Sequence, residues 1–127
     1  MKPMEILEQA RVCNNNINSK LDSLERLYLL LKHVTRREDA SPLVDKIRNL
    51  ENKTNAQIDE LIDLRETAGV IIATLPLEEQ VVIEQYYINC LSWEKIAEKM
   101  HYSIRKIYNL RKNAVDIIES LSTPDAS

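Results

Sequence analysis

Apolar side chains recur at alternating steps of three and four between residues 4 and 34. This spacing predicts an amphipathic helix with one heptad-like stripe along its length. One polar residue, Asn14, interrupts the stripe. Its members are Leu7, Ala10, Asn14, Ile17, Leu21, Leu24, Tyr28 and Leu31.

A second stripe follows a charged and polar stretch at residues 35–40, which predicts a loop. Ser41 and Pro42 match an N-cap and a proline at the first helical position, so we expect the second helix to begin there. Gly69 lies inside this helix, and Pro76 ends it. The stripe consists of Ile47, Leu50, Thr54, Gln57, Leu61, Leu64, Ala68, Ile71 and Leu75.

Two such helices joined by a short loop predict a long antiparallel helical hairpin, resembling a coiled coil, over residues 1–74. The same stripes would equally serve pairing between two chains, and the pattern does not choose between the two arrangements. Because the long stripes offer an interface, we also expect a homodimer. Residues 1–74 are therefore predicted to be a hairpin or oligomerisation region.

Three shorter helices are predicted over residues 75–119. The first runs from Leu77 to about Ile88, the second covers residues 93–100, and the third follows an N-cap at Ser103 and ends near Glu119. Residues 120–127 read as a flexible tail. The chain is thus predicted to be all-α, with a C-terminal three-helix domain after the hairpin.

The last two of these helices have the spacing of a helix-turn-helix. The small residue Ala97 lies where two helices cross, a turn position follows four residues later at His101, and apolar positions follow at Ile107 and Leu110. Glycine usually occupies that turn position because the backbone there is left-handed, whereas this chain has a histidine.

Composition agrees with an all-helical chain. Its 127 residues include one glycine, four prolines and no phenylalanine, too few turn residues for hairpins or β-α-β crossovers. The two cysteines, Cys13 and Cys90, form no disulfide or metal pattern and suit a reducing cytoplasm. The apolar runs are too short to span a bilayer. We therefore expect a cytoplasmic protein without metal or cofactor, and no constellation of residues indicates an enzyme.

Charge is unevenly distributed along the chain. The net charge is −3, yet residues 92–113 carry six Lys or Arg against two Asp or Glu, a local charge of +4. A basic segment on a helix-turn-helix indicates a contact with a polyanion, most simply double-stranded DNA.

The N-terminal part of the last helix would then lie in the major groove. Arg105, Tyr108 and Asn109 are candidates for base contacts, since arginine suits guanine and asparagine suits adenine. Phosphate contacts would come from the remaining candidates. The full set of predicted DNA-binding residues is Ser92, Lys95, Ser103, Arg105, Lys106, Tyr108, Asn109, Arg111 and Lys112.

The stretch LPLEEQVVIEQYYINCLSWEKIAEKMHYSIRKIYNLRKNAV resembles region four of bacterial sigma factors, which reads the −35 promoter element. Its part YINCLSWEKIAEKMHYSIRKIY is similar to the sigma-like, ArpU-type transcriptional regulators of phages and prophages of Gram-positive bacteria. The resemblance extends over most of residues 43–118. It implies sequence-specific control of late phage genes, by activation, through DNA binding and contact with RNA polymerase.

Two other functions compete with this one. A DNA-packaging recognition subunit, similar to a small terminase, would also join a helix-turn-helix to a helical oligomerisation region, although the DNA-binding part of such subunits usually comes first. A helical adaptor would use the basic helix to bind RNA polymerase or another acidic protein. A large ring would indicate the packaging subunit, and salt-dependent DNA binding would exclude the adaptor.

Overall fold

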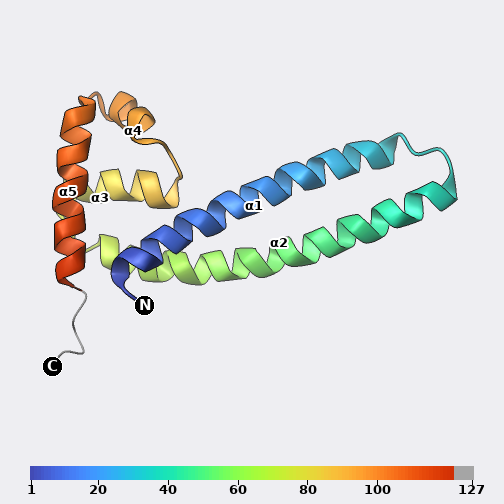
Figure 1. Ribbon diagram of the computed structural model, residues 1–127, viewed down its shortest axis with the longest axis horizontal. Coiled ribbons are helices and arrows are strands. Elements are labelled where there is room, and N and C mark those ends of the chain that lie inside the picture. Colours follow the sequence, from blue (N-terminus) through green and yellow to red (C-terminus); the bar gives the residue numbers. More distant parts are fainter. Residues whose placement is uncertain (122–127) are drawn as a thin grey trace.

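The structure, a computed structural model, describes residues 1–121, and these are all helical apart from short connections (Figure 1). The elements follow one another as α1 (Pro3–Lys32), α2 (Arg37–Ile72), α3 (Leu77–Ile83), η1 (Glu84–Ile88), α4 (Trp93–Met100) and α5 (Ile104–Ser120). The predicted fold class is therefore confirmed. The predicted tail begins one residue too early, because Ser120 still belongs to α5, and residues 122–127 lie outside the described part.

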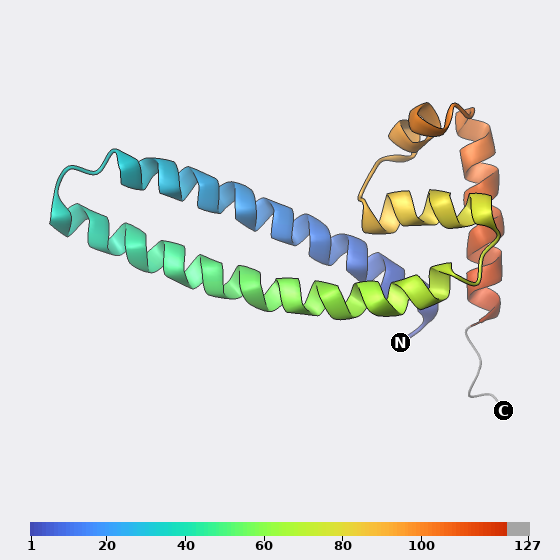
Figure 2. The same cartoon turned by 180° about the vertical axis from the view of Figure 1, so that it is seen from behind.

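Helices α1 and α2 pair antiparallel within the chain and form a long hairpin (Figures 1 and 2). The two predicted stripes meet along it, with Cys13 and Ile17 of α1 packed on Leu61 and Leu64 of α2. Thr54 is buried, and its hydroxyl donates to the carbonyl of Leu50 at 2.7 Å, so this polar member of the second stripe is satisfied locally. The stripes thus serve intramolecular pairing.

The predicted start of the second helix is wrong. Helix α2 begins at Arg37, five residues before Pro42, which lies inside the helix. Glu38 and Asp39 occupy the first turn, where their negative charges interact favourably with the positive end of the helix dipole and stabilise the helix start. Pro42 removes only the bond to the carbonyl of Glu38, and that residue is exposed to solvent, so the helix forms despite the proline.

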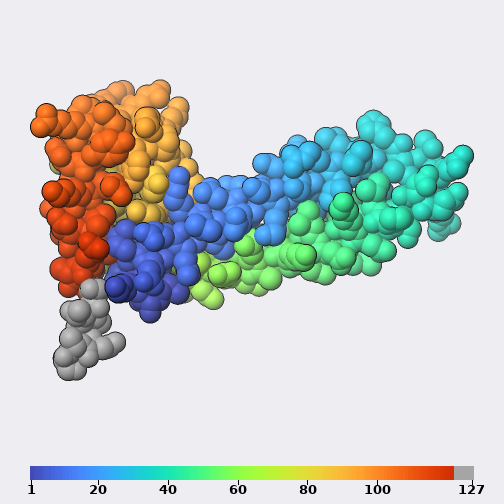
Figure 3. Space-filling view, viewed as in Figure 1, coloured from blue at the N-terminus to red at the C-terminus, as the bar shows by residue number. Residues whose placement is uncertain are grey.

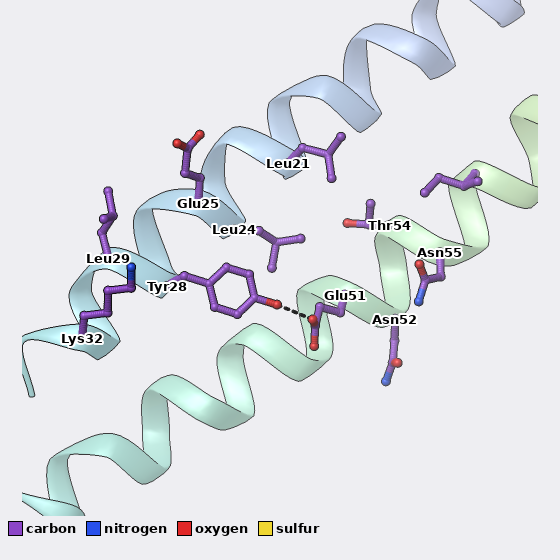
Figure 4. A pocket seen from close by; sticks show the side chains of 11 residues that line it. Leu21, Leu24, Glu25, Tyr28, Leu29, Lys32, Glu51, Asn52, Thr54 and Asn55 are labelled. Carbon is purple, nitrogen blue, oxygen red and sulfur yellow. Dashed lines mark hydrogen bonds between the residues drawn. The ribbon is translucent and has the colours of Figure 1, made fainter.

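Two predicted members of the first stripe are exposed. Leu21 and Tyr28 are 46% and 42% exposed, because a two-helix hairpin leaves the flanks of its seam open. They line a groove between α1 and α2 in the loop-side half of the hairpin, where the Tyr28 hydroxyl donates to Glu51 across the groove (Figure 4). This hydrogen bond raises the pKa of Tyr28. The hairpin therefore keeps exposed apolar surface at its flanks.

The C-terminal helices enclose a small core of their own. Val82 of α3, Ile96 and Ala97 of α4, and Ile107 of α5 are its buried members, with Leu110 partly buried beside them. Ala97 thus lies at the crossing of α4 with α5, as the spacing predicts. The predicted third helix has the expected extent, but its second half, η1, is a π-helical turn.

A second core joins the hairpin to these helices. Leu7 of α1, Ala68 of α2, Tyr87 of η1 and Ala114 of α5 all belong to it. The residues before and after the predicted boundary at 75 therefore share one core, and α5 stands across the end of the hairpin (Figures 1 and 2). Within residues 1–121, no helix combines the length and apolar character needed to cross a membrane.

Candidate nucleic-acid interface

The turn between α4 and α5 is closed by backbone and side-chain hydrogen bonds. His101 adopts a left-handed conformation with φ of 58°, and the Tyr102 N–H donates to the Ala97 carbonyl at 3.0 Å. These are the features of a Schellman C-cap. Ser103 then caps α5, since its Oγ accepts the N–H of Lys106 at 3.1 Å. The predicted turn position and the predicted N-cap are both confirmed.

Four of the predicted binding residues lie on one exposed row along α5. Arg105, Tyr108, Asn109 and Lys112 are spaced three and four apart, opposite the buried side of the helix that carries Ile107. Within the described chain, the side chains of Arg105, Asn109 and Lys112 make no hydrogen bond or ion pair. Helix α5 itself lies at the end of the molecule opposite the hairpin loop (Figure 3). Donor groups on this row are therefore free for an external partner.

Lys106 lies on one flank of this row and is engaged within the chain. Its Nζ is 3.7 Å from Oε2 of Glu78 in α3 and 3.8 Å from the centre of the Tyr102 ring. The Tyr102 hydroxyl donates to the same carboxylate at 2.5 Å. This hydrogen bond and the lysine charge lower the pKa of Glu78. The positive charge of Lys106 is therefore partly neutralised within the chain by Glu78, and this weakens the lysine as a phosphate ligand.

Arg111 lies on the other flank, at the end of a column of stacked side chains. Its guanidinium is 5.3 Å from the Trp93 ring, which stacks on Tyr86 at a centroid distance of 3.8 Å and an interplanar angle of 7°. The rings of Tyr108 and Trp93 lie in an edge arrangement with their centroids 6.5 Å apart. Trp93 therefore has a structural position, between η1 and α5, and it holds Arg111 against the domain.

The column is completed from the hairpin by Arg11, a residue that the sequence pattern did not single out. Its guanidinium lies 3.8 Å above the other face of Tyr86, and Nη1 donates to the Tyr86 carbonyl at 2.6 Å. Arg65 of α2 likewise donates to the carbonyl of Ile88 at 3.5 Å. The hairpin thus caps the carbonyls at the end of η1. No local signal predicts such contacts, because they join residues far apart in sequence.

The remaining predicted residues lie on α4 and at its start. Ser92 caps α4 by accepting the Lys95 N–H at 3.1 Å, and its own hydroxyl proton remains available to an acceptor. Lys95 is exposed and forms an i,i+3 ion pair with Glu98 at 3.7 Å. These residues lie outside the exposed row on α5.

Comparison of the chain with protein-family models, with curated proteins and with solved structures finds no match. The function is therefore inferred from the geometry and charge of this surface and from the sequence motifs.

Proposed function

We propose that the protein is a sequence-specific DNA-binding transcription regulator whose helix α5 lies in the major groove. The observation that carries the proposal is the exposed row Arg105, Tyr108, Asn109 and Lys112, whose polar members Arg105, Asn109 and Lys112 are unpaired within the described chain. The row begins at Arg105, the second residue of α5, in the N-terminal part of the helix where a helix-turn-helix places its base contacts.

The chemistry of the row suits duplex DNA. Arg105 can donate two parallel hydrogen bonds to guanine, and Asn109 can form a bidentate pair with adenine. Lys112 follows one turn later, in reach of a phosphate that fixes the register. The local charge of +4 over residues 92–113 supplies the attraction that a chain of net charge −3 otherwise lacks.

The proposed role in transcription rests on the resemblance of residues 75–115 to region four of sigma factors. That resemblance implies a target close to a promoter and, as with a sigma domain, a contact with RNA polymerase. The similarity of residues 87–108 to ArpU-type regulators of phages and prophages implies control of late phage genes as the biological role.

The test is selection of genomic fragments by the purified protein, with Arg105→Ala and Lys112→Ala beside it. Wild type should retain a defined promoter-proximal site. Arg105→Ala should lose about 1–3 kcal/mol of discrimination at one base position. Lys112→Ala should weaken binding to all DNA sequences alike and reduce the slope of log binding constant against log salt concentration by about one unit.

Arg48→Ala is the matched control, because it removes one exposed cation from the hairpin, far from α5. It should leave both the site preference and the salt slope unchanged. If wild type retains no fragment above background at low salt, α5 does not bind DNA by itself. The basic helix would then have to act on an acidic protein surface.

A further inference from the structure

The stripes that suggested a homodimer are used inside the chain, so they cannot form a dimer interface while the hairpin is intact. A different surface, however, runs along one flank of the hairpin. It consists of two grooves between α1 and α2, one toward the C-terminal helices and one toward the hairpin loop. Their charges differ in sign.

The groove near the C-terminal helices is acidic. Glu5, Glu8 and Glu60 line it together with Val12 and Cys13, and none of its described lining residues is cationic. Val12 is 58% exposed, so an apolar side chain lies among these carboxylates.

The groove near the loop is basic. Arg26, Lys46 and Lys53 line it together with Leu27 and Leu30, and none of its described lining residues is anionic. Leu30 is 56% exposed. Each half of the surface therefore combines one sign of charge with exposed apolar area.

Both grooves lie on the same flank of the hairpin. On α2, the lining residues Lys46, Lys53 and Glu60 follow one another at steps of seven, which return to the same side of a paired helix. On α1, Asn16 of the acidic groove and Ser23 of the basic groove are also seven residues apart. The two grooves thus follow one another along one side of the hairpin, one lined by acidic and the other by basic residues, and Lys20 donates to Gln57 of the acidic groove.

The opposite flank lacks this separation of charge. Its groove mixes Glu25 and Glu51 with Lys32, and the hydrogen bond from Tyr28 to Glu51 crosses it (Figure 4). This flank therefore supplies a control surface of similar shape.

We infer that the acidic-to-basic flank binds a second copy of this chain, with the two hairpins antiparallel. A two-fold axis normal to the surface places the acidic groove of each copy on the basic groove of the other, and an isologous contact of this kind is self-complementary. Apolar side chains at both ends, Val12 and Leu30, become covered at the same time. The product is an antiparallel four-helix bundle with one C-terminal domain at each end.

The test is sedimentation equilibrium of the full chain without DNA, so that its outcome is independent of the proposed function. Wild type should be a dimer that weakens with added salt, because salt screens the attraction. Lys46→Glu with Lys53→Glu leaves Arg26 as the one cation among the described lining residues of the two grooves and makes the flank predominantly acidic; both substituted residues are exposed, so the fold is retained. We expect the dimer dissociation constant of this variant to rise at least about tenfold. Its residual association should strengthen with salt, the reverse of wild type.

Two further variants make the inference specific. Glu8→Lys with Glu60→Lys makes the flank predominantly basic, and an equimolar mixture with the acidic variant should restore the dimer as a heterodimer. Lys32→Glu with Arg48→Glu reverses the same number of charges without touching this flank, since Lys32 lines the opposite groove and Arg48 lies seven residues before its Asn55. This control should dimerise like wild type. A monomeric wild type, or equal weakening by the control, would overturn the inference.

Discussion

The contact of Arg11 with Tyr86 couples the hairpin to the C-terminal helices, and its removal should lower the stability of the whole chain. Arg11→Met is the informative change, because methionine keeps an apolar stem of similar length and removes only the guanidinium. Two interactions are lost. One is the hydrogen bond to the Tyr86 carbonyl at 2.6 Å, and the other is the cation–π contact at 3.8 Å.

Their magnitudes can be estimated separately. A hydrogen bond from a charged donor contributes about 1.5–3 kcal/mol net, toward the upper end when its loss leaves the acceptor unpaired. The Tyr86 carbonyl belongs to the π-helical turn and receives no backbone N–H among the described residues, so it would depend on water. A cation–π contact of a half-buried arginine adds about 1 kcal/mol. Because the two terms overlap, we expect Arg11→Met to reduce the free energy of unfolding by about 2–3 kcal/mol.

The assay is urea denaturation followed by far-UV circular dichroism and by the fluorescence of Trp93, the only tryptophan. Trp93 stacks on the other face of Tyr86 and therefore reports on the same column. Both probes should give one midpoint, because the two halves of the chain share a core. Arg48→Met serves as the control, since Arg48 is exposed and should change stability by less than about 0.5 kcal/mol.

A double-mutant cycle with Tyr86→Leu separates the ring from the carbonyl. The substitution removes the aromatic face but leaves the backbone acceptor, so the coupling energy should be about 1 kcal/mol and the rest of the Arg11 effect should persist. If Arg11→Met costs no more than Arg48→Met, the assignment of Arg11 as the cap of η1 is refuted.

Two further substitutions address the backbone. Gly69 lies exposed in the last turn of α2, and a methyl group there meets no atom within 4 Å outside the adjacent helix backbone, so Gly69→Ala should raise the free energy of unfolding by up to about 1 kcal/mol. A loss of stability in the same denaturation assay would show that the position needs glycine. His101 has a φ of 58°, so His101→Gly should relieve the left-handed strain and add about 1 kcal/mol. A decrease in the thermal midpoint instead would mean that the imidazole stabilises the turn through a contact of its own.

Local features of the fold could be predicted from the sequence alone because they depend on residues close together in the chain. The step of three and four identified two long helices, and the serines at 92 and 103 marked the starts of α4 and α5. The left-handed turn at His101 and the small residue at Ala97 identified the helix-turn-helix. The N-cap and proline pattern at Ser41 and Pro42 predicted a helix start that is too late. The helix begins at Arg37 instead, where the carboxylates of Glu38 and Asp39 stabilise its first turn.

For the candidate interface, the sequence identified the exposed row on α5, since helical periodicity decides which residues of one helix share a face. It did not separate that row from its flanks. Lys106 forms an ion pair with Glu78, and Arg111 forms a cation–π contact with Trp93; both partners lie on other helices. Which charges remain free is a property of packing.

The sequence by itself thus determined the existence of the helices, the serine caps of α4 and α5 and the spacing of the helix-turn-helix, because the interactions behind them extend over a few residues. Only the tertiary structure decided that the stripes pair within one chain and that Arg11 caps a π-helical turn 75 residues away. A heptad stripe defines a surface to be buried but not the surface that buries it. That choice depends on loop closure and on contacts between distant segments, which no local pattern records.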